Sequence, residues 1–368
     1  MSALPSLAQM LNEFQRYMVY EYVADYQEGY LSRRDLVRRV LNITGGVGTT
    51  ATLLLALGCS PQSAQAPATT GPAAAPATSA PSAPSPAASA SPVGFLGPPA
   101  TRPPSPVAVA GVAASPAAVP GAQSPLSVAA NDPAVNGQDI SFSGADGASI
   151  LAYQARPANA SGSLPLVLVC HENRGLTEHI RDVVRRFAKE GFTACGVDLV
   201  SRQGGTASIA DPNQFSALLT GPNVNQDQFV SDFASAVAFY KTKPDLVQAD
   251  KMAMNGYCFG GGIVWRGTEQ IPELKAAAPF YGAFPPPEKW NTIKAAVLGV
   301  YSADPNDFAN QRRDELDQAL TASGDVHQFN VYPGTRHAFH NDTGNAYNQE
   351  QALAAWRDMI AWFKKYLA

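Results

Sequence analysis

Hydrophobic residues between positions 128 and 368 come in short runs bounded by glycine, proline or polar residues. The runs that predict strands are LPLVLVCHE (164–172), GFTACGVDLV (191–200), KMAMNGY (251–257), LKAAAPFYG (274–282), AAVLGVYSAD (295–304) and HQFNVYPG (327–334). Helical spacing of apolar residues occurs between and after them, in 178–190, 230–242 and 348–368. Strands that alternate with amphipathic helices predict a mostly parallel sheet with helices on both faces. Residues 139–157 alternate like an antiparallel hairpin at the edge of this sheet.

Residues 60–127 have a different composition. They hold more than half of the chain's 30 prolines, and Arg102 is their only charged residue. A segment rich in alanine, proline and serine cannot bury enough apolar surface to offset the entropy lost on ordering. We therefore predict a disordered linker over 60–127, followed by one α/β domain over 128–368.

The N-terminal part, residues 1–59, combines a basic cluster, an apolar stretch and a cysteine. Arg33 and Arg34 lie in a twin-arginine-like stretch, residues 40–57 are largely apolar, and Cys59 ends a lipobox-like sequence. This order predicts a bacterial export signal and a domain tethered by that signal or a lipid at the outer face of the cytoplasmic membrane. The alternative is a cytoplasmic protein with an N-terminal helical segment.

Composition excludes several classes of partner. A net charge of −4 and 15% charged residues provide no basic surface for nucleic acid.

Cys170 and Cys195 fall on strands that should be neighbours, where they are apolar fillers or, alternatively, a disulfide pair. His171 and His179 lie near Glu172 without a third ligand at suitable spacing, so we expect no metal site and no cofactor.

The five residues GYCFG, 256–260, match the strand–turn–helix signature in which a nucleophile has glycines two positions away on either side. Cys258 occupies the nucleophile position. The helix that begins after such a turn directs its N–H groups and positive dipole toward the side chain, which favours the thiolate. The alternative is a small buried cysteine in a glycine-rich turn.

Two further residues at strand ends suggest what Cys258 does. Asp304 follows the strand 295–302 and His337 follows the strand 327–332, so the order along the chain is nucleophile, acid, base, as in the α/β-hydrolase fold. Asp307 and His340 compete for the same roles. We favour Asp304 and His337 because they lie closer to the strand ends, and parallel sheets collect reactive groups there.

The domain resembles the dienelactone hydrolase family, a branch of the α/β-hydrolases with a cysteine nucleophile. The elbow at Cys258, YSAD ending in Asp304 and PGTRHAFH containing His337 match the family's catalytic triad. The stretch VLVCHENRGL places Glu172 where the family has a glutamate that takes the proton of the nucleophile. The resemblance implies an oxyanion hole formed by the backbone N–H groups of Asn173 and Phe259.

The resemblance also implies residues that bind substrate. VDLVSRQGG places Arg202 where an arginine grips a substrate carboxylate, and FYGAF places Tyr281 near the pocket. Family members that open dienelactone have a second arginine four residues after the histidine, whereas this chain has Asn341.

We therefore predict a hydrolase of small, carboxylate-bearing esters or lactones that works through a thioester, with dienelactone itself disfavoured as the substrate. Two alternatives remain. The first is a tethered binding module with a degenerate site, and the second is a redox role for Cys258, for which no sequence neighbour provides a resolving cysteine.

Overall fold

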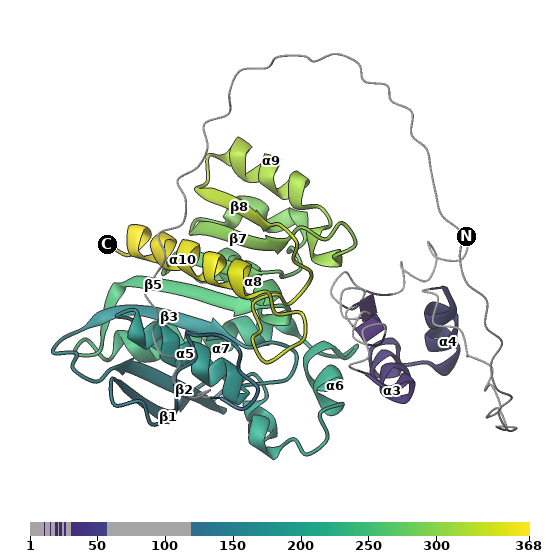
Figure 1. Ribbon diagram of the computed structural model, residues 1–368, viewed down its shortest axis with the longest axis horizontal. Coiled ribbons are helices and arrows are strands. Elements are labelled where there is room, and N and C mark those ends of the chain that lie inside the picture. The colour runs from purple at the N-terminus through teal and green to yellow at the C-terminus, as the bar shows by residue number, and fades with distance from the viewer. Residues whose placement is uncertain are drawn as a thin grey trace, which may run out of the picture. The chain divides into compact units, whose positions relative to one another are not determined.

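The computed structural model describes residues 31–56 and 119–368, together with scattered positions between 11 and 26. Its centre is an 8-stranded sheet of order β1-β2-β4-β3-β5-β6-β7-β8 (Figure 1). The strands are β1 (Val135–Ser143), β2 (Ser149–Pro157), β3 (Leu164–Cys170), β4 (Thr193–Val197), β5 (Val247–Tyr257), β6 (Leu274–Phe280), β7 (Ala296–Ser302) and β8 (His327–Tyr332). β2 pairs antiparallel with β1 and β4, which confirms the predicted hairpin, and the other pairings are parallel.

Helices cover both faces of the sheet, as the alternating pattern predicts. They are α5 (Glu178–Lys189), α6 (Gln214–Thr220), α7 (Gln226–Lys241), α8 (Phe259–Gln270), α9 (Arg313–Ser323) and α10 (Gln349–Tyr366), with the 3-10 turns η1 (Ser201–Gln203), η2 (Thr206–Ser208), η3 (Pro287–Thr292) and η4 (Phe308–Asn310). Adjacent residues of β2 show the two layers. Tyr153 accepts a hydrogen bond from Arg185 of α5, and Gln154 accepts one from Tyr240 of α7. Because neighbouring side chains on a strand point to opposite faces, α5 and α7 lie on opposite sides.

Aromatic packing joins α5 to α10 on one of these faces. The ring of Phe187 lies 4.8 Å from that of Trp356 and 6.1 Å from that of Phe363.

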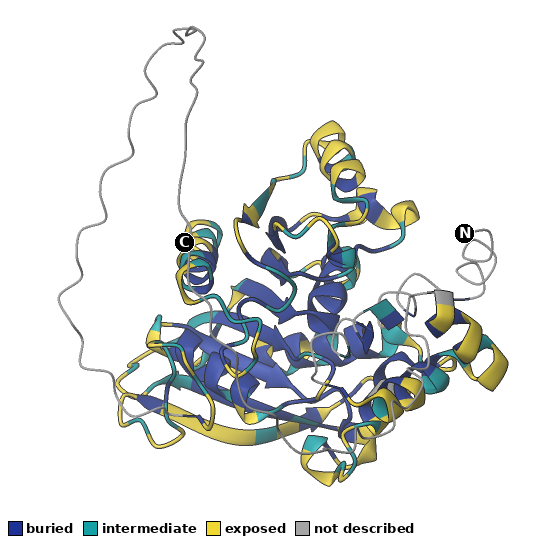
Figure 2. Ribbon diagram, turned by 45° about the vertical axis from the view of Figure 1, so that its right-hand side comes forward, coloured by how far each residue is buried: buried dark blue, intermediate teal, exposed yellow. Residues whose placement is uncertain are grey.

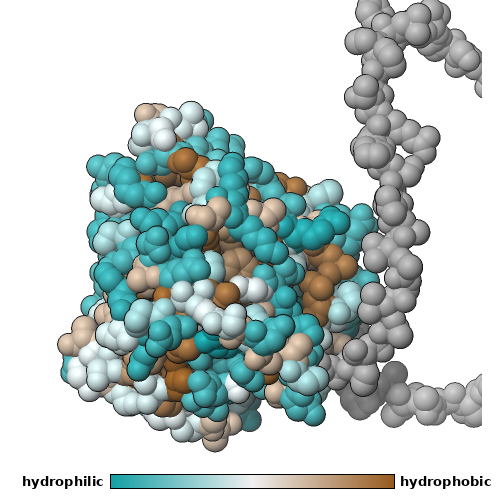
Figure 3. All heavy atoms as spheres, turned by 90° about the vertical axis from the view of Figure 1, so that its left-hand side faces the viewer, coloured by the Kyte–Doolittle hydropathy of each residue, from teal (hydrophilic) through white to brown (hydrophobic). Residues whose placement is uncertain are grey.

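Figure 2 shows the central strands buried between the two helical layers. On the face seen in Figure 3, hydrophilic residues predominate and hydrophobic ones form small separate groups. The buried hydrophobic side chains of the described residues form one core cluster.

Residues 31–56 include the helices α3 (Arg33–Thr44) and α4 (Val47–Ala56). The Ser32 hydroxyl caps α3 by accepting the backbone N–H of Asp35 at 3.2 Å. The predicted twin-arginine-like stretch thus forms the first turn of α3. Of the helices in the described residues, none combines the length and the apolar character of a membrane span. The expectations for Cys59 and for the linker up to residue 118 lie outside the described residues.

Residues 119–127, which the prediction assigns to the linker, contact the domain where the structure describes them, and Val119 is buried. The backbone N–H of Ser124 donates to Asp342 at 3.0 Å, and the Ser127 hydroxyl donates to Asp182 at 2.8 Å. Composition alone misses this segment because its anchors are polar contacts to residues far along the chain.

Candidate active site

Cys258 occupies a strained backbone position between β5 and α8. Its φ of 54° and ψ of −117° lie outside the regions that ordinary residues prefer, as expected for a nucleophile elbow. Its backbone N–H donates to the carbonyl of Phe280 at 3.0 Å, and its own carbonyl accepts the N–H of Gly262 at 3.2 Å. The side chain is buried, so the thiol is held in one place at the N-terminus of α8.

The glycines around Cys258 are required by close backbone contacts. A Cβ atom on Gly260 would lie 2.5 Å from the carbonyl oxygens of both Cys170 and His171. A Cβ on Gly256 would lie 2.5 Å from the oxygen of Gly260 and 2.9 Å from the Cβ of Cys170. The end of β3 therefore presses directly against the first turn of α8.

His337 pairs with Asp307. The Nδ1 atom of His337 lies 3.1 Å from Oδ1 of Asp307, whose carboxylate is fully buried. The same carboxylate accepts the hydroxyl of Ser302 and the backbone N–H of Ala309. Although burial opposes ionisation, the neighbouring His337 and these donors lower the pKa of Asp307 below its usual value. A carboxylate thus faces the imidazole and fixes its orientation.

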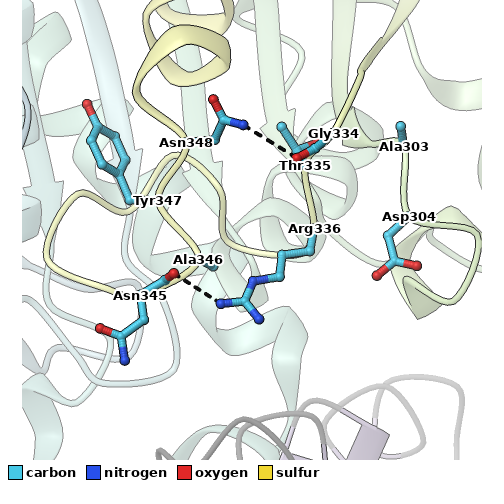
Figure 4. Close-up of a pocket in the computed structure, with 9 residues that line it drawn as sticks. All are labelled: Ala303, Asp304, Gly334, Thr335, Arg336, Asn345, Ala346, Tyr347 and Asn348. Atoms are coloured by element: carbon cyan, nitrogen blue, oxygen red, sulfur yellow. Dashed lines mark hydrogen bonds between the residues drawn. The ribbon is translucent and has the colours of Figure 1, made fainter. Parts of the chain in front are cut away.

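The expectation that Asp304 would hold the ring of His337 is wrong, because the loop turns back after Asp304. The Asp304 carboxylate accepts the N–H of Asn306 at 2.8 Å, and its carbonyl accepts the N–H of Asp307 at 3.1 Å. Its side chain lines a pocket of about 450 Å³. Figure 4 shows this pocket, in which Arg336 donates to the carbonyl of Asn345 at 3.0 Å. Neither Cys258 nor His337 lines it.

The choice of His337 over His340 agrees with the geometry. The ring of His337 lies 5.0 Å from that of Tyr281 and 4.8 Å from that of Phe308. His340 is buried and stacks on Tyr257 at 5.0 Å. Burial lowers the pKa of His340 to about 3, so it is a neutral residue of the core.

Glu172 follows β3 and contacts Asn341. Asn341 stands four residues after His337, where the sequence comparison leads one to expect an arginine. The Nδ2 of Asn341 donates to Oε2 of Glu172 at 2.8 Å. The Oδ1 of Asn341 accepts both the backbone N–H and the hydroxyl of Thr343, at 3.0 and 2.8 Å. These two contacts fix the orientation of the amide, so that its NH2 group must face Glu172. The Asn341 amide is therefore a fixed donor to this carboxylate.

Arg202 is held by two carboxylates of the protein itself. Nη1 and Nη2 donate to Asp232 at 2.8 Å each, and Nε donates to Asp146 at 2.9 Å. These partners raise the pKa of Arg202 above its ordinary value. These N–H groups of Arg202 therefore already donate within the protein, and fewer are left to bind a substrate carboxylate.

The other residues singled out from the sequence lie either just after a strand or on a strand. Asn173 is buried in the loop after β3, and Phe259 is the first residue of α8. Cys170 and Cys195 are free, buried cysteines on β3 and β4 that do not face each other in the strand register. The predicted fillers are thus confirmed and the disulfide is not formed. Among the described residues, no group of three or more metal-binding side chains occurs.

Comparison with known proteins gives a consistent result. The model of the dienelactone hydrolase family matches residues 150–367. An Escherichia coli K12 protein assigned provisionally as a carboxymethylenebutenolidase is 33% identical over 235 residues, 60% of this chain and 84% of that protein. A similarly assigned Methylorubrum extorquens protein is 34% identical over 227 residues, 59% of this chain and 77% of that protein.

A solved structure is also similar. The crystal structure of a provisionally assigned dienelactone hydrolase from Klebsiella pneumoniae superposes with a TM-score of 0.58 at 32% identity. It covers 63% of this chain and 100% of that chain.

Proposed function

Because the chain belongs to the dienelactone hydrolase family, we propose that this hydrolase cleaves small carboxylic esters or lactones through a thioester on Cys258. The observation that carries the proposal is the pair of the buried Asp307 and the half-buried His337 at the same sheet edge as the strained elbow of Cys258. A nucleophile, a base and a residue that orients the base are the parts that covalent acyl transfer requires.

Acylation begins with loss of the thiol proton. Asp307 accepts the Nδ1 proton of His337, so Nε2 is the basic nitrogen, and it takes the proton from Cys258. The sulfur then attacks the substrate carbonyl carbon. The resulting oxyanion accepts the backbone N–H groups of Asn173 and Phe259, and the imidazolium donates its proton to the leaving alkoxide. The products of this step are an alcohol and a thioester.

Deacylation uses the same groups in reverse. His337 removes a proton from water, the hydroxide attacks the thioester, and the sulfur leaves with the proton held by the imidazolium. Thiolate is a better leaving group than an amine, so a tetrahedral adduct with an amide reverts while one with an ester proceeds. Esters and lactones are therefore favoured over peptides.

Glu172 is proposed to share in activating the nucleophile, as the family resemblance implies. The hydrogen bond from Asn341 orients the Glu172 carboxylate at the end of β3, which packs against the first turn of α8. The thiol proton then passes to Glu172 and from it to Nε2 of His337, so that the same imidazolium protonates the leaving alkoxide.

The charge of the substrate depends on which donors of the site are open to it. Arg202 already binds Asp232 and Asp146, and Asn341 is uncharged. A substrate carboxylate would meet only the N–H groups of Arg202 that these two aspartates do not use. We propose acidic esters as substrates because Arg202 keeps these N–H groups, and neutral esters are tested beside them because its other donors are already used.

The test is hydrolysis of p-nitrophenyl acetate, p-nitrophenyl hemisuccinate and a set of enol lactones by the full chain. Wild type is compared with Cys258→Ala and Cys258→Ser. We expect the alanine variant to lose at least about 10³-fold in kcat, because the nucleophile is gone. The serine variant should retain more activity than alanine, and the intact mass of wild type during turnover should increase by one acyl group.

Turnover that survives in Cys258→Ala would contradict the proposal. Wild type that is folded and reduced but hydrolyses none of these compounds would instead favour the tethered binding module.

We further propose that the domain is exported and held at the outer face of the cytoplasmic membrane. The support is the order of basic cluster, apolar stretch and Cys59 along the sequence. Mass spectrometry of the native N-terminus should find an acylated chain that begins at Cys59. A chain that retains Met1 or Ser2 and stays in the soluble fraction would overturn this proposal.

A further inference from the structure

The imidazole of His171 lies buried between the ends of β3 and β4. Its Nδ1 lies 2.6 Å from the backbone oxygen of Glu172, and its Nε2 lies 3.1 Å from the backbone nitrogen of Leu199. Both ring nitrogens are thus bound to main chain, and neither contact belongs to the catalytic set described above.

The contacts determine where the ring proton sits. The backbone N–H of Leu199 is a donor, so Nε2 must be the acceptor. Burial lowers the pKa of His171, although Asp198 partly opposes this, and the ring is therefore neutral with its single proton on Nδ1. The Nδ1–H group donates to the carbonyl of Glu172.

That carbonyl belongs to the same peptide group as the N–H of Asn173. A peptide unit is rigid, planar and almost always trans, so holding the oxygen on one side fixes the direction of the N–H on the other. A Cβ on Gly260 would collide with the carbonyl oxygens of Cys170 and His171. The backbone that leads into this peptide is therefore packed against the first turn of α8, next to Cys258.

We propose that His171 is a positioning residue for the oxyanion hole. Its hydrogen bond to the Glu172 carbonyl fixes the direction of the Asn173 N–H, and it polarises the peptide so that this N–H becomes a better donor. The inference rests on the proposed function, in which the Asn173 N–H binds the oxyanion.

A second contact holds the same loop farther along and includes no atom of His171. The backbone N–H of Leu176 donates to the hydroxyl of Thr206 at 2.7 Å, and that hydroxyl donates to Asp198 at 3.0 Å. With this support in place, a change at His171 should reorient one peptide and leave the loop folded.

Two substitutions separate the two contacts of the ring. In His171→Asn the side-chain NH2 group reaches the position of Nδ1 and keeps the donor to Glu172. In His171→Gln the side-chain oxygen reaches the position of Nε2 and keeps the acceptor for Leu199. We expect His171→Gln to lose about 10²-fold in kcat with little change in KM, since loss of one oxyanion donor costs about 10²–10³-fold. His171→Asn should stay at least about 10-fold more active than His171→Gln.

Two cysteine reagents provide a readout that general disruption of the site would not reproduce. A trifluoromethyl ketone adds Cys258 sulfur to its carbonyl carbon, the thiol proton passes to His337, and the new oxyanion enters the hole. Iodoacetamide alkylates the same sulfur with release of iodide and forms no oxyanion. His171→Gln should weaken ketone binding by about the same factor as kcat/KM and leave the alkylation rate within about 2-fold of wild type.

The inference is overturned if both variants lose activity equally, or if alkylation slows in parallel with ketone binding. Failure of the proposed function is seen separately, as wild type that is alkylated at Cys258 but hydrolyses no ester or lactone. The ketone and alkylation measurements still test His171 in that case.

Discussion

Cys258, the proposed nucleophile, and Asp307 with His337, the proposed acid–base pair, lie at the same edge of the sheet, yet they are held by different kinds of contact. On the nucleophile side, main chain packs on main chain. The carbonyls of Cys170 and His171 leave no space for a side chain on Gly260, and the strained φ of Cys258 is enforced by this packing.

On the acid–base side, side-chain hydrogen bonds hold the loops. Asp307 is fixed by Ser302 and by the N–H of Ala309, and it in turn orients His337. The two sides should therefore be disrupted by different kinds of substitution. The nucleophile side should be sensitive to an added atom, and the acid–base side to a lost charge or hydrogen bond.

The largest effect is expected from Asp307→Asn. The amide keeps the shape of the carboxylate but no longer stabilises the imidazolium or selects the tautomer of His337, so kcat should fall by about 10³-fold, or about 4 kcal/mol. Asp304→Asn is the matched control and should stay within about 3-fold of wild type. Steady-state kinetics and thermal unfolding of both variants provide the measurement. The opposite order of the two losses would restore Asp304 as the acid.

Gly260→Ala tests the nucleophile side. The added Cβ would lie 2.5 Å from two backbone oxygens, which cannot move without shifting β3, so we expect the free energy of unfolding to fall by about 3 kcal/mol. Gly162→Ala is the control, because no atom lies within 4 Å of its Cβ, and its stability should change by less than about 1 kcal/mol. Urea unfolding measures both. Equal stabilities would show that the elbow is not closely packed.

The same contrast explains what the sequence can predict. The elbow is predictable because all five of its residues are contiguous, and His337 is predictable because it follows a strand directly. Asp304 and Asp307 differ by three positions, and only the path of the loop decides which one meets the imidazole.

Partners that are far apart in the chain are harder to predict. Arg202 meets Asp232 across 30 positions and Asp146 across 56, and Asn341 meets Glu172 across 169. Such pairs depend on how the whole fold brings loops together, which neither periodicity nor spacing encodes. The predicted export signal rests on sequence alone and stays a prediction.

Beneath the acid–base side, Asp342 anchors the loop that follows His337. Its fully buried carboxylate accepts Arg186 Nη2 at 2.8 Å and the N–H of Ser124 at 3.0 Å, and His179 Nδ1 lies 3.1 Å away. Although burial opposes ionisation, His179 and Arg186 hold the pKa of Asp342 well below its usual range. Through Ser124, Asp342 also joins the segment 119–127 to the loop that contains Asn341.

Asp342→Asn should therefore lower the free energy of unfolding by about 2 kcal/mol at pH 7, as loss of hydrogen bonds to a charged group does. Because the folded pKa lies below the unfolded value of about 3.9, the carboxylate's contribution is complete above about pH 5 and is lost as the pH falls toward the folded pKa. The gap between wild type and variant should narrow by about 1 kcal/mol from pH 7 to pH 3.

Urea unfolding at the two pH values measures this gap. Glu273→Gln, which breaks the surface pair with Lys241, is the control and should cost no more than about 1 kcal/mol. A gap for Asp342→Asn that is no larger than the control's, or one that widens as the pH falls, would mean that the acid–base side does not depend on this charge. In that case the acid–base side would differ from the close-packed elbow only in the hydrogen bonds around Asp307.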